Sequence, residues 1–203
     1  MVSPFGQLPT PSNTFVKTAL LTGSIIAIAY LGACLALYYY QPKLIFRPLP
    51  FLTSTPADIG LAYEDVQIPV APNAGTLPDA GTLPDAGPLA DAGTLHGWWL
   101  PNPMTDRTLL FCHGNYGNIS YNLERIRFYY DLGFSILAFD YRGYGLSSGP
   151  YPNEQNTYAD AEAAWQYLLT ERQISPESIT VMGHSMGGAI AIDLSVRHPN
   201  SDR

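Results

Sequence analysis

The chain has 203 residues, of which 46% are hydrophobic and 13% charged, and its formal net charge is −7. This length suffices for one domain, and the composition is typical of a globular core plus an apolar segment. An acidic chain without a basic cluster offers little to bind phosphates, so we expect no nucleic-acid partner. The two cysteines, Cys34 and Cys112, do not form the spacing of a disulfide framework or a metal site. We expect Cys112 to be a buried small side chain and not a reactive thiol.

The N-terminal region combines a polar start with a long apolar stretch. Residues 1–17 are rich in Pro, Ser and Thr and are predicted to be disordered. The stretch 18–40 carries no charge, and as a helix of about 23 residues it would be roughly 34 Å long, which spans a bilayer. Three tyrosines at 38–40 close it, and Lys43 and Arg47 follow at headgroup depth. The sequence therefore predicts a single-pass transmembrane helix, with the membrane as a partner.

Other interpretations of this apolar stretch stay open. It could be a buried core helix, or a secretory signal peptide, although the apolar run of a signal peptide is usually shorter. Residues 31–34 also resemble a lipoprotein cleavage box, but the apolar run continues past Cys34. Lys17 lies on one flank and Lys43 and Arg47 on the other, so the distribution of charge does not determine the orientation in the membrane.

Two strands are expected next, at 61–70 and 95–101, joined as a hairpin. The insert between them, 72–94, contains a repeat of six residues, Gly-Thr-Leu-Pro-Asp-Ala, which starts at Gly75, recurs at Gly81 and then degenerates. A β-solenoid would need at least about three full repeats to bury a core, and the proline of each unit removes a ladder donor. We therefore predict a disordered hairpin insert, which costs little because loop-closure free energy grows only logarithmically with length.

Strands and helices alternate from residue 107 onward. The pattern predicts strands at 107–112, 134–139 and 178–182, and helices at 119–132, 156–171 and 187–198. The second of these strands is apolar throughout, as expected for a parallel strand buried on both faces. The alternation predicts an α/β fold with a mostly parallel sheet and helices on both of its faces.

The strand at 178–182 leads into a G-x-S-x-G sequence formed by Gly183, Ser185 and Gly187. A serine between a strand and a helix in this pattern is typical of a nucleophile elbow, in which a strained serine is presented at a sharp turn. Glycine at the flanking positions avoids collisions because it has no Cβ atom. A chance match in a glycine-containing turn is the alternative, but the strand and helix on either side favour the elbow. We therefore predict that Ser185 is a nucleophile.

Two further motifs also follow predicted strands. They are HGN at 113–115 and DYRGYGLSSG at 140–149. Together with GHSMGG at 183–188, in this order, they resemble an α/β-hydrolase, and most closely the one-span, membrane-anchored group that includes the bud-emergence-related proteins and the ABHD lipid hydrolases. The resemblance covers about residues 41–203 apart from the insert. It implies an α/β-hydrolase sheet after the N-terminal helix and a substrate that is an ester, thioester or amide.

The resemblance also implies roles for the residues around Ser185. The backbone N–H groups of Met186 and Asn115 would form the oxyanion hole that stabilises the negative charge during acyl transfer. Asp140 and Arg142 would tie their loop to its neighbours, and a catalytic role for Asp140 is a minor alternative. No cofactor or metal is implied, and an acyl-lipid substrate follows only from the expected anchor. The residues implied to support the site by shaping its turns are His113, Gly114, Gly183, His184, Gly187 and Gly188.

A base for Ser185 is missing from the sequence. None of the four histidines, His96, His113, His184 and His198, is expected to reach the nucleophile. In this fold the acid and the histidine follow the nucleophile along the chain, and only about eighteen residues do so here. We therefore expect the chain to be the N-terminal part of a longer hydrolase, whose strand at 178–182 is left as an exposed edge.

Two functions follow from these observations. The first is a membrane-anchored serine hydrolase that acts by acyl transfer through Ser185. The second is a catalytically inactive remnant or a non-catalytic, membrane-bound binding module. A gene that continues past Arg203 with a strand-borne aspartate and a later histidine would favour the first function.

Overall fold

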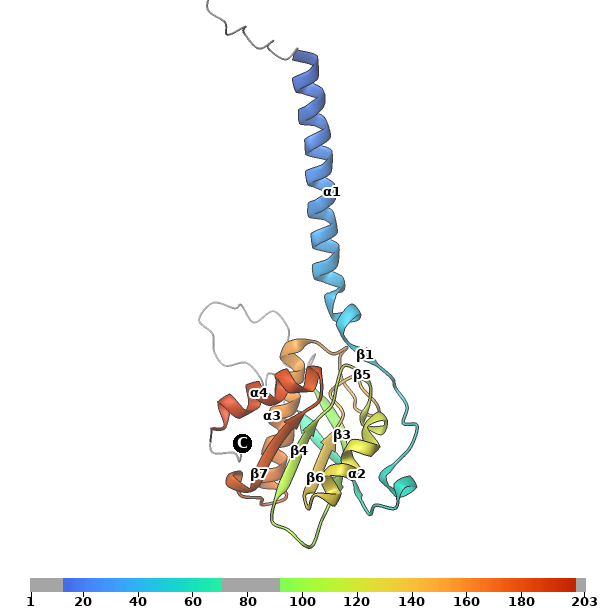
Figure 1. Ribbon diagram of the computed structural model, residues 1–203, viewed down its shortest axis with the longest axis vertical. Helices are drawn as coiled ribbons and strands as arrows, with labels where there is room; N and C mark the ends of the chain where they lie inside the picture. Colours follow the sequence, from blue (N-terminus) through green and yellow to red (C-terminus); the bar gives the residue numbers. More distant parts are fainter. Residues whose placement is uncertain (1–12, 71–91, 200–203) are drawn as a thin grey trace, which may run out of the picture. The chain divides into compact units, whose positions relative to one another are not determined.

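The computed structural model describes residues 13–70 and 92–199 (Figure 1). Its contacts divide the chain into two units, Met1–Gln41 and Pro42–Arg203, and each is described by itself. The repeat that starts at Gly75 and most of the N-terminal stretch predicted to be disordered lie outside the described residues.

Helix α1, Asn13–Ile45, supplies the first unit. It extends beyond the predicted stretch 18–40 at both ends, so residues 13–17 are helical where disorder was predicted. The part from Val16 to Ile45 has the length and composition of a membrane span, and near an N-terminus a signal sequence shares these features. None of its most apolar window is buried inside the protein, which argues against the core-helix alternative.

The second unit is built on a five-stranded sheet in the order β2-β3-β6-β4-β7 (Figure 1). β2 and β3 pair antiparallel, as do β3 and β6, whereas β4 pairs parallel with both β6 and β7. The predicted α/β fold with a mostly parallel sheet is confirmed, because β3 alone runs in the opposite direction to the other four strands. The strands are β2 Glu64–Val70, β3 Gly93–Leu100, β4 Thr108–Cys112, β6 Ser135–Phe139 and β7 Ile179–Gly183.

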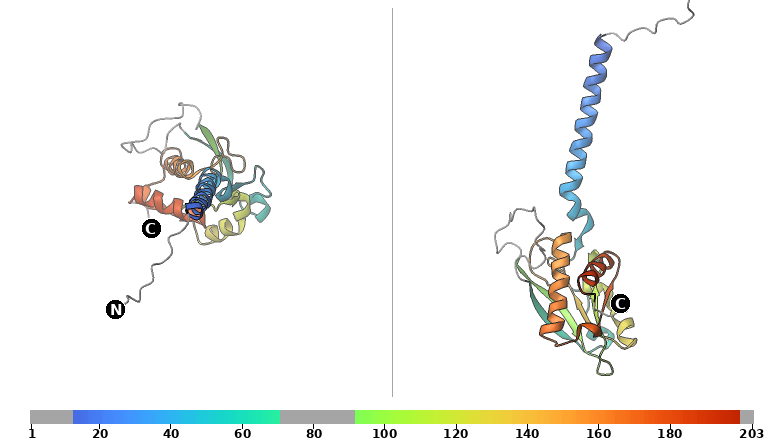
Figure 2. Two further views of the ribbon diagram at one scale, coloured as in Figure 1. Left: turned by 90° about the horizontal axis from the view of Figure 1, so that it is seen from above. Right: turned by 90° about the vertical axis from the view of Figure 1, so that its left-hand side faces the viewer.

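Helices cover both faces of this sheet, and each face has its own hydrophobic cluster. Helices α3, Glu154–Thr170, and α4, Met186–Arg197, pack on one face, and α2, Leu123–Asp131, packs on the other (Figure 2). Alternate residues of β4 divide between the two clusters: Leu110 contributes to the first and Leu109 to the second. This division is expected, since successive side chains of a strand point to opposite faces.

The predicted helix at 119–132 is split in two. A 3₁₀ helix, Ile119–Asn122, precedes α2, because the Asn118 side chain accepts a hydrogen bond from the Ser120 N–H at 3.0 Å and starts a tight turn there. The helical stretch ends before Gly133, whose φ of 90° suits the left-handed position after a helix. Two other 3₁₀ helices are Pro56–Ile59 and Pro176–Ser178.

The pairing of β2 with β3 determines the residues at which the insert begins and ends. Val70 pairs with Gly93, so Gly93 and Thr94 belong to β3 and not to the insert, which was predicted to reach residue 94. Close packing requires glycine at position 93, because a Cβ atom there would lie 2.6 Å from the Ser148 carbonyl oxygen. The Thr94 N–H donates to Ser148 Oγ at 3.0 Å, which fixes the start of β3 against the loop after β6.

A second, two-stranded sheet joins distant parts of the domain. Strand β1, Arg47–Pro48, begins two residues after the end of α1 and pairs in parallel with β5, Tyr116–Gly117. Leu49 extends the pairing, because its N–H donates to the Gly117 carbonyl oxygen at 3.1 Å.

Strand β7 lies at an edge of the five-stranded sheet. Its only pairing among the described strands is with β4. Ile179 is buried, but Thr180, Val181 and Met182 are only half-buried. The prediction that this strand forms an exposed edge is confirmed for the part of the chain that the structure describes.

Candidate active site

Ser185 lies at the turn between the end of β7 and the start of α4, and its side chain is exposed. Its backbone has φ 55° and ψ −121°. Residues with a side chain rarely adopt this conformation, and it persists only where the surrounding structure enforces it. The His184 N–H donates to the Cys112 carbonyl oxygen at 3.0 Å, and the Gly187 N–H donates to the His184 carbonyl oxygen at 3.0 Å. These bonds tie the turn to the end of β4.

Two flanking glycines allow this conformation. A Cβ atom on Gly183 would overlap the Gly187 carbonyl group, and one on Gly187 would overlap the backbone of Cys112 and the His113 carbonyl oxygen. Gly188 is different, since the nearest atom to a Cβ atom there would be 3.9 Å away. Close backbone packing therefore requires glycine at 183 and 187 but not at 188.

The loop after β4 lies against this turn. A Cβ atom on Gly114 would be 3.5 Å from Ser185 Cβ and 3.4 Å from the His184 carbonyl oxygen. Within the described residues, the backbone N–H groups of Asn115 and Met186 donate to no protein acceptor. The structure thus brings Ser185 next to the Asn115 loop and leaves two backbone donors unused there.

His113 holds this loop from inside the domain. Its Nδ1 lies 2.7 Å from the Gly114 carbonyl oxygen, and because a carbonyl only accepts, Nδ1 carries the proton and donates. The ring is fully buried between Tyr141 and Tyr144, with ring centroids 4.4 and 5.0 Å away. Burial lowers the pKa of His113, and the charge of Asp140 opposes this effect. These contacts suit a residue that shapes the loop.

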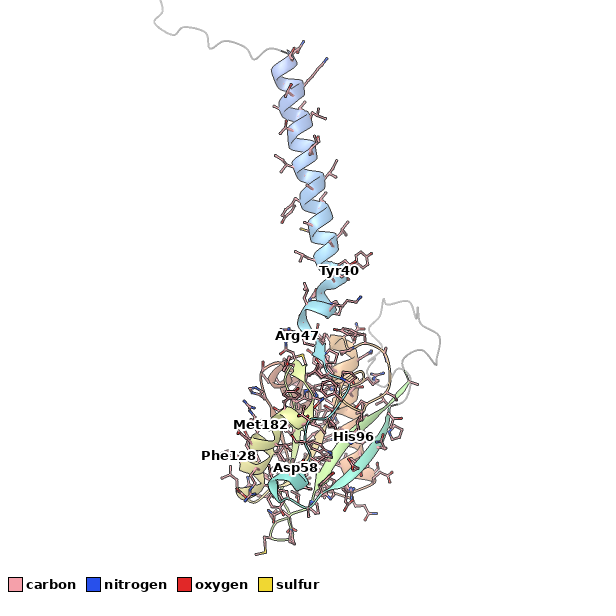
Figure 3. All side chains as sticks on the ribbon, turned by 90° about the vertical axis from the view of Figure 1, so that its right-hand side faces the viewer. Tyr40, Arg47, Asp58, His96, Phe128 and Met182 are labelled. Atoms are coloured by element: carbon pink, nitrogen blue, oxygen red, sulfur yellow. The ribbon has the colours of Figure 1, made fainter. Side chains whose placement is uncertain are left out.

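Asp140 is buried at the end of β6 and binds several elements together. Its Oδ1 accepts the Ile119 N–H at 2.7 Å and lies 3.3 Å from His113 Nε2. Its Oδ2 lies 4.0 Å from Nδ1 of His96, a residue of β3 (Figure 3), whose Nε2 is 2.8 Å from Asp65 Oδ1. Burial lowers the pKa of His96, but the nearby carboxylates of Asp140 and Asp65 outweigh this effect and raise it. Asp140 thus joins the loops after β4 and β6 to the hairpin.

Arg142 links the loop after β6 to α3. Its Nε donates to Asp160 Oδ1 at 2.5 Å, its backbone N–H donates to Asp160 Oδ2 at 2.8 Å, and both side chains are buried. Burial raises the pKa of Asp160 to about 6, against the effect of the Arg142 charge. The pair is a structural connection, in keeping with the role expected for Arg142.

The other two histidines are used elsewhere. His184 is half-buried beside Gly114, and burial together with the charge of Arg125 lowers its pKa. His198 follows α4, where its Nε2 lies 2.9 Å from Glu162 Oε2 and its ring stacks on Trp165. Across the described residues, no acidic or histidine side chain forms a hydrogen bond with Ser185, so a nucleophile and a base are not assembled there.

Other reactive groups do not gather at this turn. Burial raises the pKa of the Cys112 thiol to about 12, which makes it a poor nucleophile. Among the residues described, no group of three or more His, Cys, Asp or Glu side chains has an arrangement that could hold a metal ion.

Sequence reasoning missed one contact of the site. The Tyr144 hydroxyl donates to the Asn115 carbonyl oxygen at 2.8 Å, and so holds the loop that carries an unused donor. The only signal in the sequence was the place of Tyr144 within the 140–149 motif.

Comparisons with known proteins agree with this architecture. Residues 107–201 match a family model described as the alpha/beta hydrolase fold. An esterase of Pyrococcus furiosus has a similar structure, with a TM-score of 0.56 and 28% sequence identity over 73% of this chain and 50% of that one. An alpha-beta hydrolase of Vibrio vulnificus gives a TM-score of 0.51 at 27% identity over 71% and 44%.

Curated sequences show the same similarity over a shorter region. An uncharacterised protein of Mycobacterium tuberculosis is 39% identical over 107 residues, which cover 52% of this chain and 38% of that protein. Human alpha/beta hydrolase domain-containing protein 17C is 43% identical over 100 residues, 47% of this chain and 29% of its own length. The chain therefore matches less than two fifths of either relative. Together the comparisons support the α/β-hydrolase fold for this chain.

Proposed function

The chain has the α/β-hydrolase fold, with a partial sheet, and from this premise we propose that Ser185 is the nucleophile of a hydrolase that cleaves an ester, thioester or amide. The observation that carries the proposal is the strained serine, at φ 55° and ψ −121°, on a turn between a strand and a helix. A fold does not determine an activity, but a strained, exposed serine with enforced geometry is a site feature that an acyl-transfer mechanism uses.

The reaction would proceed by acyl transfer. Ser185 Oγ attacks the carbonyl carbon of the substrate, its proton passes to a base, and the carbonyl oxygen becomes an oxyanion. The unused N–H groups of Met186 and Asn115 are the donors that we assign to this oxyanion, and Met186 also begins α4, whose N-terminus favours negative charge. The leaving group departs with a proton, and water then releases the acyl group from Ser185.

We assign the acid and the base to protein outside the described residues. Two observations support this assignment. No described side chain forms a hydrogen bond that could activate Ser185, and in this fold the acid and the histidine follow the nucleophile along the chain. The truncation expected from the sequence remains part of this proposal. The second candidate function is a non-catalytic binding module, and it is supported by the same observation that no described side chain serves as a base for Ser185. A gene without a continuation that supplies both groups would favour that candidate.

We also propose that α1 is a single membrane span that anchors the hydrolase domain. Its apolar stretch is long enough, and no buried contacts compete for it. A small-molecule or acyl-lipid substrate is compatible with such an anchor.

A serine-reactive fluorophosphonate tests the nucleophile. In a version extended by whatever coding sequence follows Arg203, Ser185→Ala should abolish labelling and the turnover of a short-chain ester. Ser195→Ala, a serine of the same helix whose hydroxyl bonds only the Ala191 carbonyl, is the control and should label normally. In the 203-residue chain, labelling should be slower by roughly 10⁴-fold or more, the typical cost of losing a triad member. Labelling that survives Ser185→Ala in the extended version would overturn the proposal.

A further inference from the structure

Asn115 connects the proposed oxyanion hole to the segment 45–47, where α1 ends and β1 begins. Its side-chain Nδ2 donates to the Ile45 carbonyl oxygen at 2.7 Å. Its backbone carbonyl oxygen accepts two hydrogen bonds, from the Arg47 N–H at 2.9 Å and from the Tyr144 hydroxyl at 2.8 Å. The side chain and the following peptide are thus fixed, whereas the backbone N–H donates to no acceptor among the described residues.

The end of α1 needs this contact. Ile45 is the last residue of the helix, and a carbonyl group in the last turn has no partner within the helix. The Asn115 amide satisfies that carbonyl from outside, as a C-terminal cap. The next two residues are bound as well. The Phe46 carbonyl oxygen accepts a hydrogen bond from the Tyr151 hydroxyl at 2.7 Å, and Arg47 (Figure 3) pairs with Tyr116, the residue after Asn115.

We propose that Asn115 is a positioning residue through which the segment 45–47 sets the direction of the oxyanion-donating N–H. The inference rests on the proposed function of Ser185, Met186 and Asn115. An oxyanion donor is effective only within about 2.7–3.1 Å of the developing charge, and a shift of about 1 Å can cost roughly 10²-fold in rate. A movement of the segment after α1 is therefore transmitted to the reaction by a residue whose side chain does not touch the substrate.

Position 115 has a chemical requirement under this proposal. The side chain must donate to a carbonyl oxygen, which an amide does and a carboxylate does not. Asn118 provides a matched comparison, because its Nδ2 donates to the carbonyl oxygens of Leu49 and Phe51, at 3.1 and 2.6 Å, in the continuation of the same segment. Its backbone N–H is assigned no part in the reaction. A purely structural role for Asn115 predicts that the two asparagines behave alike.

The test measures the rate at which a fluorophosphonate modifies Ser185 in the version extended past Arg203, by intact mass, after thermal melts confirm that each variant folds. Tyr144→Phe and Asn115→Ala should each slow modification by about tenfold, since they loosen the Asn115 peptide without removing its N–H. The controls are Tyr130→Phe, whose hydroxyl donates to the Pro101 carbonyl oxygen and not to the segment 45–47, and Asn118→Ala. Both should stay within about twofold of the unmodified chain, even where they lower the melting temperature more.

The outcomes separate this inference from the proposed function. If the extended version, before any substitution, is not labelled at Ser185, the proposed function fails and the inference fails with it. If Ser185 is labelled but Tyr144→Phe and Tyr130→Phe react alike, only the inference is overturned. Hydrogen exchange adds an independent measurement: the Arg47 amide should exchange about tenfold faster in Asn115→Ala, and an unchanged rate would contradict the link.

Discussion

At the scale of single residues, the turn at Ser185 shows which features a sequence encodes locally. The positions of Gly183 and Gly187 could be predicted because a Cβ atom at either position would collide with backbone atoms. For Gly183 these atoms lie a few residues along the chain, and for Gly187 they lie at the end of the adjacent strand. The contacts of Asn115 could not, because the Ile45 carbonyl that its side chain binds lies 70 residues away in the sequence. A pattern of residue types identifies the serine, but long-range hydrogen bonds that fix its surroundings emerge only with the fold.

The two glycines in the first turn of α4, Gly187 and Gly188, give a prediction at this scale. Gly187→Ala should destabilise the domain by about 2–4 kcal/mol, because the added Cβ atom meets the backbone of Cys112 and His113, which cannot move aside without shifting β4. Gly188→Ala is the matched control, and it should be neutral or stabilise by up to about 1 kcal/mol because alanine favours the helix. Urea unfolding measures both. Equal effects of the two substitutions would contradict the packing argument.

At the scale of elements, the alternation of strands and helices after residue 107 was predictable, and the boundaries were less so. The apolar runs and the helical spacing mark the side chains that are buried in the folded domain, so they identify its strands and helices. The split of the helix predicted at 119–132 depends on the Asn118 side chain, which also binds the Leu49 and Phe51 carbonyl groups, so a distant segment decides where the α-helix begins. The start of β3 was missed because Gly93 and Thr94 look like repeat units but pair with β2.

The contact between α3 and α4 gives a pH-dependent prediction. Glu162 of α3 pairs with Arg197 and with His198 Nε2, the latter at 2.9 Å. Burial raises the pKa of Glu162, but the hydrogen bonds from Gln166 and His198 and the nearby positive charges outweigh it and hold the pKa below its ordinary value of 4.5. Because the folded protein favours the carboxylate, this stabilisation is complete above about pH 4.5 and is lost as the pH falls through the lower folded-state pKa.

Glu162→Gln should therefore lower the free energy of unfolding by about 1–2 kcal/mol at pH 7. The difference from the unmodified chain should shrink as the pH falls below about 4.5. Glu171→Gln, at the exposed end of the same helix, is the control and should change stability by less than about 0.5 kcal/mol. A difference between Glu162→Gln and the unmodified chain that persists undiminished at low pH would show that packing, and not charge, joins the two helices.

At the scale of the whole molecule, the N-terminal helix gives the first prediction. If it spans a membrane, the protein should remain in the membrane fraction through washes with high salt and alkaline carbonate, because about twenty apolar residues insert essentially irreversibly. Fractionation followed by immunoblotting measures this. Recovery of the intact chain in the soluble fraction would contradict the anchor, and a mature form that begins near residue 34 would indicate a cleaved signal instead.

The repeat gives the second prediction at this scale. Removing residues 75–92 leaves about four residues between β2 and β3, a length that hairpins commonly use. Stability should change by less than about 0.5 kcal/mol, since we predict that the insert adds no core. Deleting a segment of the paired strands, such as Gly93 with Thr94, is the contrasting change and should be strongly destabilising. A loss above about 2 kcal/mol on removal of the repeat would show that it packs against the domain.

The pairing of Val70 with Gly93 has a consequence for how this gene can change. Directly opposed residues in adjacent strands are only about 5 Å apart, so the two ends of whatever lies between them meet at one point on the rim of the sheet. A repeat of six codons can therefore be copied or lost there without altering the reading frame or the spacing of the strands. We expect related genes to differ in repeat number at this position, and a fluorescent reporter domain inserted there should leave the hydrolase domain folded.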